Sequence, residues 1–172
     1  MNLPPNEELS PRSYNFVKAL EFTLPWETGK TKTGELRPDG GLQYLDQGKP
    51  TKYGIWQGAN PDIDVPSLTL SQAIEIYKDR YWLVYLTKKP VYANLDSTEV
   101  GVAVALFDAG VNAGVGRAWG WFLQCYKDKD PAKALNQLRG AFYATKKDNK
   151  NYNGWMNRLN DLKKYVDILK TA

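Results

Sequence analysis

Two carboxylates and a threonine early in the chain have the types and the spacing that could cleave a glycosidic bond. Glu27 stands where an apolar-periodic segment gives way to a glycine-rich stretch, and Asp46 and Thr51 follow on a polar loop. One carboxyl group can protonate the departing sugar oxygen, while the second carboxyl group and the hydroxyl hold the attacking water. Glu35 and Asp39 lie in the same stretch and compete with Asp46 for the second role.

The position of Glu27 suits a general acid. A carboxyl group in the last turn of a helix faces the negative end of the helix dipole, and the neighbouring Trp26 would keep water away. Both effects penalise the ionised form, so we expect Glu27 to hold a proton near neutral pH. A structural role stays open, because most glutamates at helix ends are solvated, and Asp46 and Thr51 are of types common in turns.

The chain contains no histidine and a single cysteine, Cys125. Without imidazole, serine–histidine and cysteine–histidine nucleophiles are excluded as usually built, and so is every zinc site that depends on histidine. One cysteine cannot form an intrachain disulfide, and we expect this thiol to pack in the interior. We therefore expect no metal and no cofactor, and any hydrolysis must rely on carboxylates, hydroxyls, lysines or backbone groups.

Size and charge limit the number of domains and the kinds of partner. The 172 residues, 42% of them hydrophobic, suffice for one core, so we expect a single domain over residues 1–172 and a monomer. The net charge of +4 favours acidic partners, such as nucleic acid, an anionic envelope or a wall polymer. The lysines within residues 146–150 are typical of a solvated face, and no nucleic-acid motif accompanies them, so we expect no nucleic-acid partner.

The sequence predicts neither export nor membrane insertion. Residues 1–11 are polar and proline-rich and lack the basic and apolar regions of a secretory signal. The longest apolar run, residues 100–111, contains Asp108 and is well short of the roughly 20 residues that cross a bilayer. We therefore expect a protein without a transmembrane segment that is made in the cytoplasm.

A helix must position Glu27, and the spacing predicts one. Ser13 precedes apolar residues at 16, 17, 20 and 24, which form one stripe on a helix that ends near residues 25–27. Residues 28–57 are interrupted by glycines and prolines, so we expect short strands and turns there. The candidate acid is thus predicted to lie at the junction of a helix and a small β element.

The rest of the chain is predicted to be helical. Thr69 and Gln72 form a capping-box pattern, and the helix that begins after Ser97 is apolar nearly all round, which is typical of the middle of a bundle. The predicted helices cover, in order, about residues 71–83, 98–111, 117–127, a segment opened by Asp130-Pro131, and a segment after Asn153. The fold class is therefore mostly α (α+β), a helical bundle with a small β or loop element at about residues 28–57.

Four segments match a known family in order. The polar loop is Asp46-Gln-Gly-Lys-Pro-Thr51-Lys-Tyr53-Gly54-Ile55. The others are Leu70-Ser-Gln-Ala-Ile-Glu-Ile-Tyr-Lys-Asp-Arg-Tyr-Trp82, Leu106-Phe-Asp-Ala-Gly-Val-Asn112-Ala-Gly114 and Gly154-Trp-Met-Asn-Arg158. Together with the helix-ending Glu27, they resemble the phage and prophage muramidases of glycoside hydrolase family 108 over about residues 16–162. The last two segments resemble the part of this family that is often called a peptidoglycan-binding domain.

The resemblance implies a lysozyme-like fold and an endolysin that cleaves the β-1,4 bond between N-acetylmuramic acid and N-acetylglucosamine in bacterial peptidoglycan. It implies Glu27 as the acid and Asp46 with Thr51 as the pair that positions water. Residues 12–95 would be the catalytic part and residues 96–172 the helical peptidoglycan-binding-like part of the same unit, after a flexible N-terminus. It also implies release from the host cytoplasm to the cell wall, and hence bacterial lysis.

The candidate substrate contacts are Tyr53, Gly54, Trp56, Asp108 and Asn112. Tyr53 and Trp56 could stack on sugar rings, whereas Trp82 is favoured as a core residue. Asp108 and Asn112 lie about one helical turn apart and point the same way, so they bind either a neighbouring backbone group or a sugar amide.

Two alternative functions stay open. A non-catalytic peptidoglycan-binding module could keep the same fold, although it would not need Glu27. A lytic transglycosylase uses a similar acid but forms an anhydro sugar without adding water. A water-positioning pair such as Asp46 and Thr51 would be superfluous in that reaction.

Overall fold

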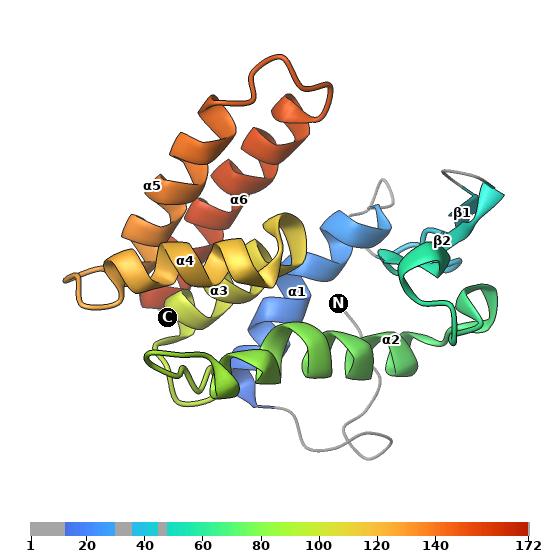
Figure 1. Ribbon diagram of the computed structural model, residues 1–172, viewed down its shortest axis with the longest axis horizontal. Helices are drawn as coiled ribbons and strands as arrows, with labels where there is room; N and C mark the ends of the chain where they lie inside the picture. The colour runs from blue at the N-terminus through green and yellow to red at the C-terminus, as the bar shows by residue number, and fades with distance from the viewer. Residues whose placement is uncertain (1–12, 30–35, 45–47, 172) are drawn as a thin grey trace.

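The computed structural model describes residues 13–29, 36–44 and 48–171. Within these ranges the chain forms six α-helices and one small antiparallel sheet, which confirms the predicted mostly-α, lysozyme-like architecture (Figure 1). The helices are α1 (Tyr14–Thr28), α2 (Leu70–Tyr77), α3 (Val100–Ala113), α4 (Val115–Cys125), α5 (Pro131–Ala144) and α6 (Tyr152–Thr171). The strands are β1 (Gln43–Tyr44), β2 (Pro50–Lys52) and β3 (Ile55–Trp56), joined in the order β1-β2-β3.

Helix α3 lies at the centre of the bundle, as its apolar composition predicts. Residues 101–110 are all buried, and the helix contacts α1, α4, α5 and α6. A helix that is apolar nearly all round must be covered on every side, so the other helices pack around it. Asp108 is the charged exception on this helix.

Helix α1 carries the candidate acid in its last turn. Ser13 caps the helix by accepting a hydrogen bond from the Phe16 backbone N–H, as the sequence predicts. The helix continues past Pro25 and ends at Thr28, followed by Gly29 in the left-handed region at φ 74°. Glu27 is thereby fixed at the exit of the helix, next to the sheet.

The sheet confirms the predicted small β element after α1. Strand β2 pairs with β3 in the register Thr51↔Trp56 and Lys52↔Ile55, so the turn between them consists of Tyr53 and Gly54. Both turn residues have positive φ, 52° and 75°, which is the signature of a type I′ hairpin turn. The pairing places Thr51 and Trp56 side by side on one face of the hairpin.

The second predicted helix is interrupted. Thr69 and Gln72 form the expected capping box, but α2 ends at Tyr77 and gives way to the π-helical turn η5 (Lys78–Trp82) and the 3₁₀ helix η6 (Leu83–Thr87). In this stretch Trp82 is 2% exposed and packs against Phe16 and Phe107, which confirms the core assignment. π-Helical turns often occur at functional sites, and this one borders the candidate site described below.

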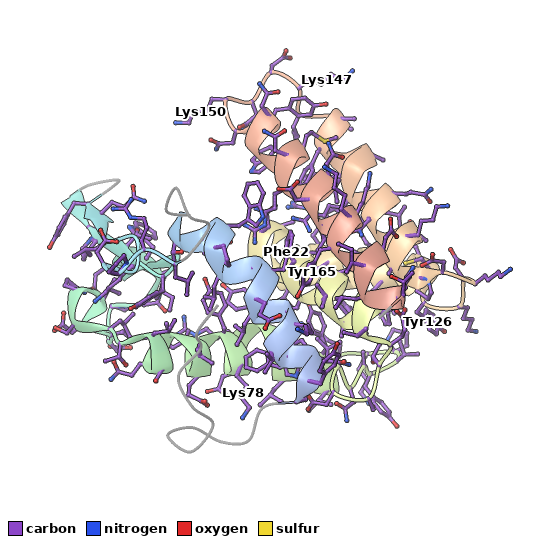
Figure 2. The ribbon with its side chains drawn as sticks, turned by 180° about the vertical axis from the view of Figure 1, so that it is seen from behind. Phe22, Lys78, Tyr126, Lys147, Lys150 and Tyr165 are labelled. Atoms are coloured by element: carbon purple, nitrogen blue, oxygen red, sulfur yellow. The ribbon has the colours of Figure 1, made fainter. Side chains whose placement is uncertain are left out.

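Helices α5 and α6 form an antiparallel pair that extends from α3 and α4 (Figure 1). Asp130 caps α5 by accepting from the Lys133 N–H, with Pro131 in the first turn, as the sequence predicts. The loop with Lys147 and Lys150 lies at the far end of the pair, while the ring of Phe22 of α1 packs against that of Tyr165 of α6 near the centre (Figure 2). Among the described residues, no helix is long and apolar enough to cross a membrane.

Candidate active site

Glu27 opens onto a cleft of about 160 Å³ between the β2–β3 hairpin and α2. The cleft is lined by residues of α1, β3, α2, η5 and α3, among them Glu27, Gly54, Trp56, Tyr77, Arg80 and Tyr81. Glu27 is partly covered, with its side chain 19% exposed. The structure therefore brings the predicted acid together with Gly54 and Trp56 of the polar loop.

The hairpin turn lies directly against Glu27. A β-carbon added at Gly54 would lie 2.7 Å from Glu27 Oε2 and 2.7 Å from the Tyr77 hydroxyl, closer than any side chain could fit. The Tyr77 hydroxyl donates a hydrogen bond of 2.7 Å to the backbone oxygen of Tyr53, which fixes the turn to α2. Glycine is required at position 54 both by its φ of 75° and by this close approach.

The opposite side of Glu27 is bound by an arginine from α6. Arg158 Nη1 donates to Glu27 Oε1 at 2.6 Å, and Arg158 Nη2 donates to Asp108 Oδ1 at 2.6 Å. Arg139 of α5 donates to the other oxygen of Asp108 at 2.8 Å, and Thr23 of α1 donates to Oδ1 at 3.0 Å. We call Glu27, Arg158, Asp108 and Arg139 the ion-pair cluster, in which two carboxylates face two guanidinium groups.

Asp108 and Arg158, two buried members of the ion-pair cluster, are held in their charged forms. Burial alone would raise the pKa of Asp108, but Arg158 and Arg139 beside it outweigh burial and hold that pKa below its ordinary value. Burial would lower the pKa of Arg158, but Asp108 and Glu27 together raise it, so this guanidinium stays charged throughout the accessible pH range. Arg158 also binds Glu27 at 2.6 Å, and the expected proton on Glu27 stays a prediction.

Two tyrosines on the wall of the cleft stay neutral. Burial and the negative charge of Glu27 raise the pKa of Tyr77 well above its ordinary value. The same two causes raise the pKa of Tyr81. Both phenols can therefore donate hydrogen bonds at neutral pH, Tyr77 to the turn and Tyr81 toward the cleft that it lines.

The structure gives Asp108 and Asn112 an anchoring role, one of the two roles that the sequence left open, in place of the contact with a sugar. They do share one face of α3, but that face meets α5 and α6, and the Asp108 side chain is 0% exposed. The amide oxygen of Asn112 accepts hydrogen bonds from Arg139 and Tyr143. Asp108 therefore anchors helices and has no surface to offer a sugar, and the partly buried Asn112 belongs to the same hydrogen-bond network.

The two aromatic candidates for sugar stacking, Tyr53 and Trp56, differ in their exposure to the cleft. Tyr53 is 8% exposed, and its ring packs on Gly40, where an added β-carbon would lie 2.6 Å from the ring. The predicted sugar stacking by Tyr53 is thus corrected to a packing role, because the left-handed turn directs its ring into the sheet region. Trp56 is 36% exposed and lines the cleft, with its indole lying across Gly58 and the ammonium of the exposed Lys49 over its ring at 5.9 Å from the centroid. A ligand that stacks on this ring would displace the Lys49 side chain.

The partner of Glu27 in catalysis stays a prediction. Thr51 is partly buried and lies beside Trp56 on the hairpin. Asp46 and its competitor Glu35 lie outside the described residues. The other competitor, Asp39, is exposed and accepts from Arg37 at 2.7 Å and from the Gly41 N–H at 2.9 Å, so it stabilises its own turn.

Sequence reasoning missed the contribution of arginines. Arg158 and Arg139 lie among apolar residues on the buried faces of α6 and α5, and Arg80 of η5 lines the cleft and donates to Asn60. A charged residue inside an apolar stripe, such as Arg158 beside Leu159, was the available signal. Within the part of the chain that the structure describes, no group of three or more metal-ligating side chains comes together.

The part of the chain that contains the cleft matches a known protein family. A family model described as glycosyl hydrolase 108 matches residues 21–114, which is more than half of the chain. The match includes Glu27 and every residue that lines the cleft, whereas α4, α5 and α6 lie beyond it. Neither the curated proteins nor the solved structures include a match to this chain.

Proposed function

Because the chain belongs to glycosyl hydrolase family 108 and is therefore a glycosidase, we propose that it cleaves the β-1,4 bond between N-acetylmuramic acid and N-acetylglucosamine in bacterial peptidoglycan. The observation that carries the proposal is the position of Glu27. Among the described residues that line the cleft, it is the one with a carboxyl group, and the family match covers it. General acid catalysis by a carboxyl group is the usual route to glycosidic cleavage.

In the proposed mechanism, Glu27 protonates the glycosidic oxygen as the bond to the leaving sugar breaks. Positive charge then develops on the muramic acid ring, and Asp46 stabilises this charge and, with Thr51, delivers the water. Arg158 binds one oxygen of Glu27 at 2.6 Å. A glycan that fills the cleft would exclude water from Glu27 during the proton transfer.

The walls of the cleft suit a glycan that carries negative charge. Trp56 offers a partly exposed indole on which a sugar ring can stack once the exposed Lys49 side chain moves from its face. Arg80 places a guanidinium group on the same cleft, and the chain as a whole carries a net charge of +4. Peptidoglycan bears carboxylates on its stem peptides, so these cations would attract it toward Glu27.

The biological setting is part of the proposal. The resemblance to phage and prophage muramidases supports an endolysin that is made in the host cytoplasm and reaches the wall after release, where it lyses the cell. The division into a catalytic part and a C-terminal peptidoglycan-binding-like part, and the monomeric state, are proposed on the same basis.

The test is to identify the fragments that the protein releases from purified peptidoglycan by mass spectrometry after reducing-end labelling. Muramic acid at the reducing end is the expected product. Glucosamine reducing ends would assign cleavage of the other glycosidic bond, and anhydro-muramic acid would indicate a lytic transglycosylase. Binding to the wall without any fragment would leave a non-catalytic peptidoglycan-binding module.

A further inference from the structure

We propose that Arg158 is a positioning residue for Glu27, so that α6 completes an active site whose cleft is built by the family-matched region. The inference rests on the proposed function of Glu27 as the acid. Arg158 lies 44 positions beyond the end of the matched residues 21–114, and it is not among the described residues that line the cleft. Its side chain is 7% exposed, so it acts on Glu27 from inside the protein.

The geometry of Arg158 is that of a rigid fork between two carboxylates. Its Nη2 and Nε both donate to Asp108, at 2.6 and 3.1 Å from Oδ1, while Nη1 donates to Glu27. The planar guanidinium cannot turn toward one partner without leaving the other. Asp108 is itself fixed by Arg139 and Thr23, so the position of the guanidinium is determined before any substrate arrives.

This contact distinguishes the two oxygens of Glu27. Oε1 accepts from Arg158, and Oε2 lies against Gly54, on the side of the hairpin turn and the cleft. A guanidinium group has donors and no acceptor, so a proton on Oε1 could not be donated to Arg158 and would weaken the hydrogen bond that Oε1 accepts. We therefore place the proton that Glu27 transfers on Oε2, the oxygen that faces the turn.

A purely structural role is the competing explanation, because Arg158 also neutralises the buried Asp108. Arg139 provides the matched control. It is fully buried, donates to the same carboxylate at 2.8 Å, and its other hydrogen bonds go to Tyr143 and Asn112. Replacing either guanidinium group removes hydrogen bonds to Asp108. Of the two arginines, Arg158 is the one that also donates a hydrogen bond to Glu27.

The experiment compares Arg158→Lys with Arg139→Lys, since each variant keeps a positive charge but loses the planar guanidinium group that can bind two partners at once. Both are assayed on soluble peptidoglycan oligomers, with the folded fraction measured by circular dichroism. We expect Arg158→Lys to lower kcat by about 100-fold with little change in KM, because misplacement of the acid affects the chemical step. Arg139→Lys should lower kcat by at most about tenfold after correction for the folded fraction, because it loosens Asp108 but leaves the hydrogen bond from Arg158 to Glu27 in place.

Equal losses of kcat in the two variants, or wild-type kcat in folded Arg158→Lys, would overturn the positioning role and leave the proposed function intact. A wild-type protein that releases no fragments would instead contradict the proposed function. If Arg158→Lys does not fold, Thr23→Val takes its place, because it removes the hydrogen bond that Asp108 Oδ1 accepts from Thr23 and leaves both arginines and their counter-charge. A loss of kcat with unchanged KM is again expected, and an unchanged kcat would count against the positioning role.

Discussion

Arg158 of α6 donates a hydrogen bond of 2.6 Å to Glu27 of α1, which lies 131 positions earlier in the chain. Through this contact and the shared partner Asp108, the C-terminal helices are linked to the end of the helix that carries the acid. On its other side, Glu27 meets Gly54 and the hairpin turn. The candidate acid is thus positioned by elements from both ends of the chain.

Gly54→Ala should reduce activity by crowding Glu27. The added β-carbon would lie 2.7 Å from Glu27 Oε2 and from the Tyr77 hydroxyl, so the carboxyl group or the turn must move. A displacement of this kind should lower kcat by about 100-fold, and the positive φ should cost about 1–2 kcal/mol of stability. Steady-state kinetics and thermal unfolding would measure the two effects.

Gly48→Ala is the matched control for this variant. Gly48 has a φ of 71°, similar to that of Gly54, but nothing lies within 4 Å of its added β-carbon. It should therefore show the backbone strain without the collision. If Gly48→Ala and Gly54→Ala lower kcat equally, contact with Glu27 does not explain the requirement for glycine at position 54.

Trp56→Ala should weaken substrate binding more than the chemical step. The indole is exposed on the cleft, and loss of a stacking contact worth about 0.5–1.5 kcal/mol should raise KM by up to about tenfold. Trp56→Phe should restore much of the affinity. Tyr92→Ala removes an even more exposed aromatic ring that is not among the described residues lining the cleft, so its KM should match that of wild type. An unchanged KM in Trp56→Ala would exclude stacking.

The ion-pair cluster should make stability depend on acid pH. The pKa of Asp108 is lower in the folded protein than its ordinary value of 3.8, so the ionised carboxylate stabilises the fold above that pH. This contribution is lost as the pH falls through the folded-state pKa. Asp108→Asn should cost about 3–5 kcal/mol at neutral pH, because two buried arginines lose a counter-charge.

The difference in Tm between wild type and Asp108→Asn should therefore be large at pH 7 and should narrow below about pH 4. Thermal unfolding monitored by circular dichroism across this pH range would measure it. A difference that is constant from pH 7 to pH 2 would show that Asp108 does not contribute through its charge.

Cys125 should be unreactive in the folded protein. The thiol is 2% exposed, as its predicted packing role requires, and burial raises its pKa to about 11. Since the thiolate is the reactive form, alkylation by iodoacetamide at pH 8 should be slow until the protein is unfolded in denaturant. Rapid modification of the native protein, followed by mass spectrometry, would contradict the buried position.

Local sequence patterns predicted the helices well. Three helix starts were predicted from their capping residues, namely Ser13, the Thr69–Gln72 pair and Asp130-Pro131. These starts can be recognised in the sequence because capping depends on residues only a few positions apart. The central position of α3 followed from its composition. The π-helical turn after Tyr77 could not be predicted in this way, since it departs from the regular helical period and places Tyr81 at the cleft and Trp82 in the core.

The site was predicted less completely than the fold. The position of Glu27 at the end of a predicted helix indicated that it could be the acid, and the structure places it at the cleft with Gly54 and Trp56. The roles of Tyr53 and Asp108 depend on which way a turn and a helix face, and these orientations are set by contacts with α2, α5 and α6. The contact with Arg158 joins residues that no local pattern relates.

The most direct test of the account is the rate at which folded Glu27→Gln releases reducing ends from purified peptidoglycan, compared with wild type at equal concentration. Glu21→Gln, on the same helix and paired with Lys18, serves as the control for the charge change. We expect Glu27→Gln to lose at least about 100-fold in rate, because glutamine cannot supply a proton, while Glu21→Gln stays close to wild type. A folded Glu27→Gln protein that retains near-normal turnover would contradict the assignment of Glu27 as the catalytic acid.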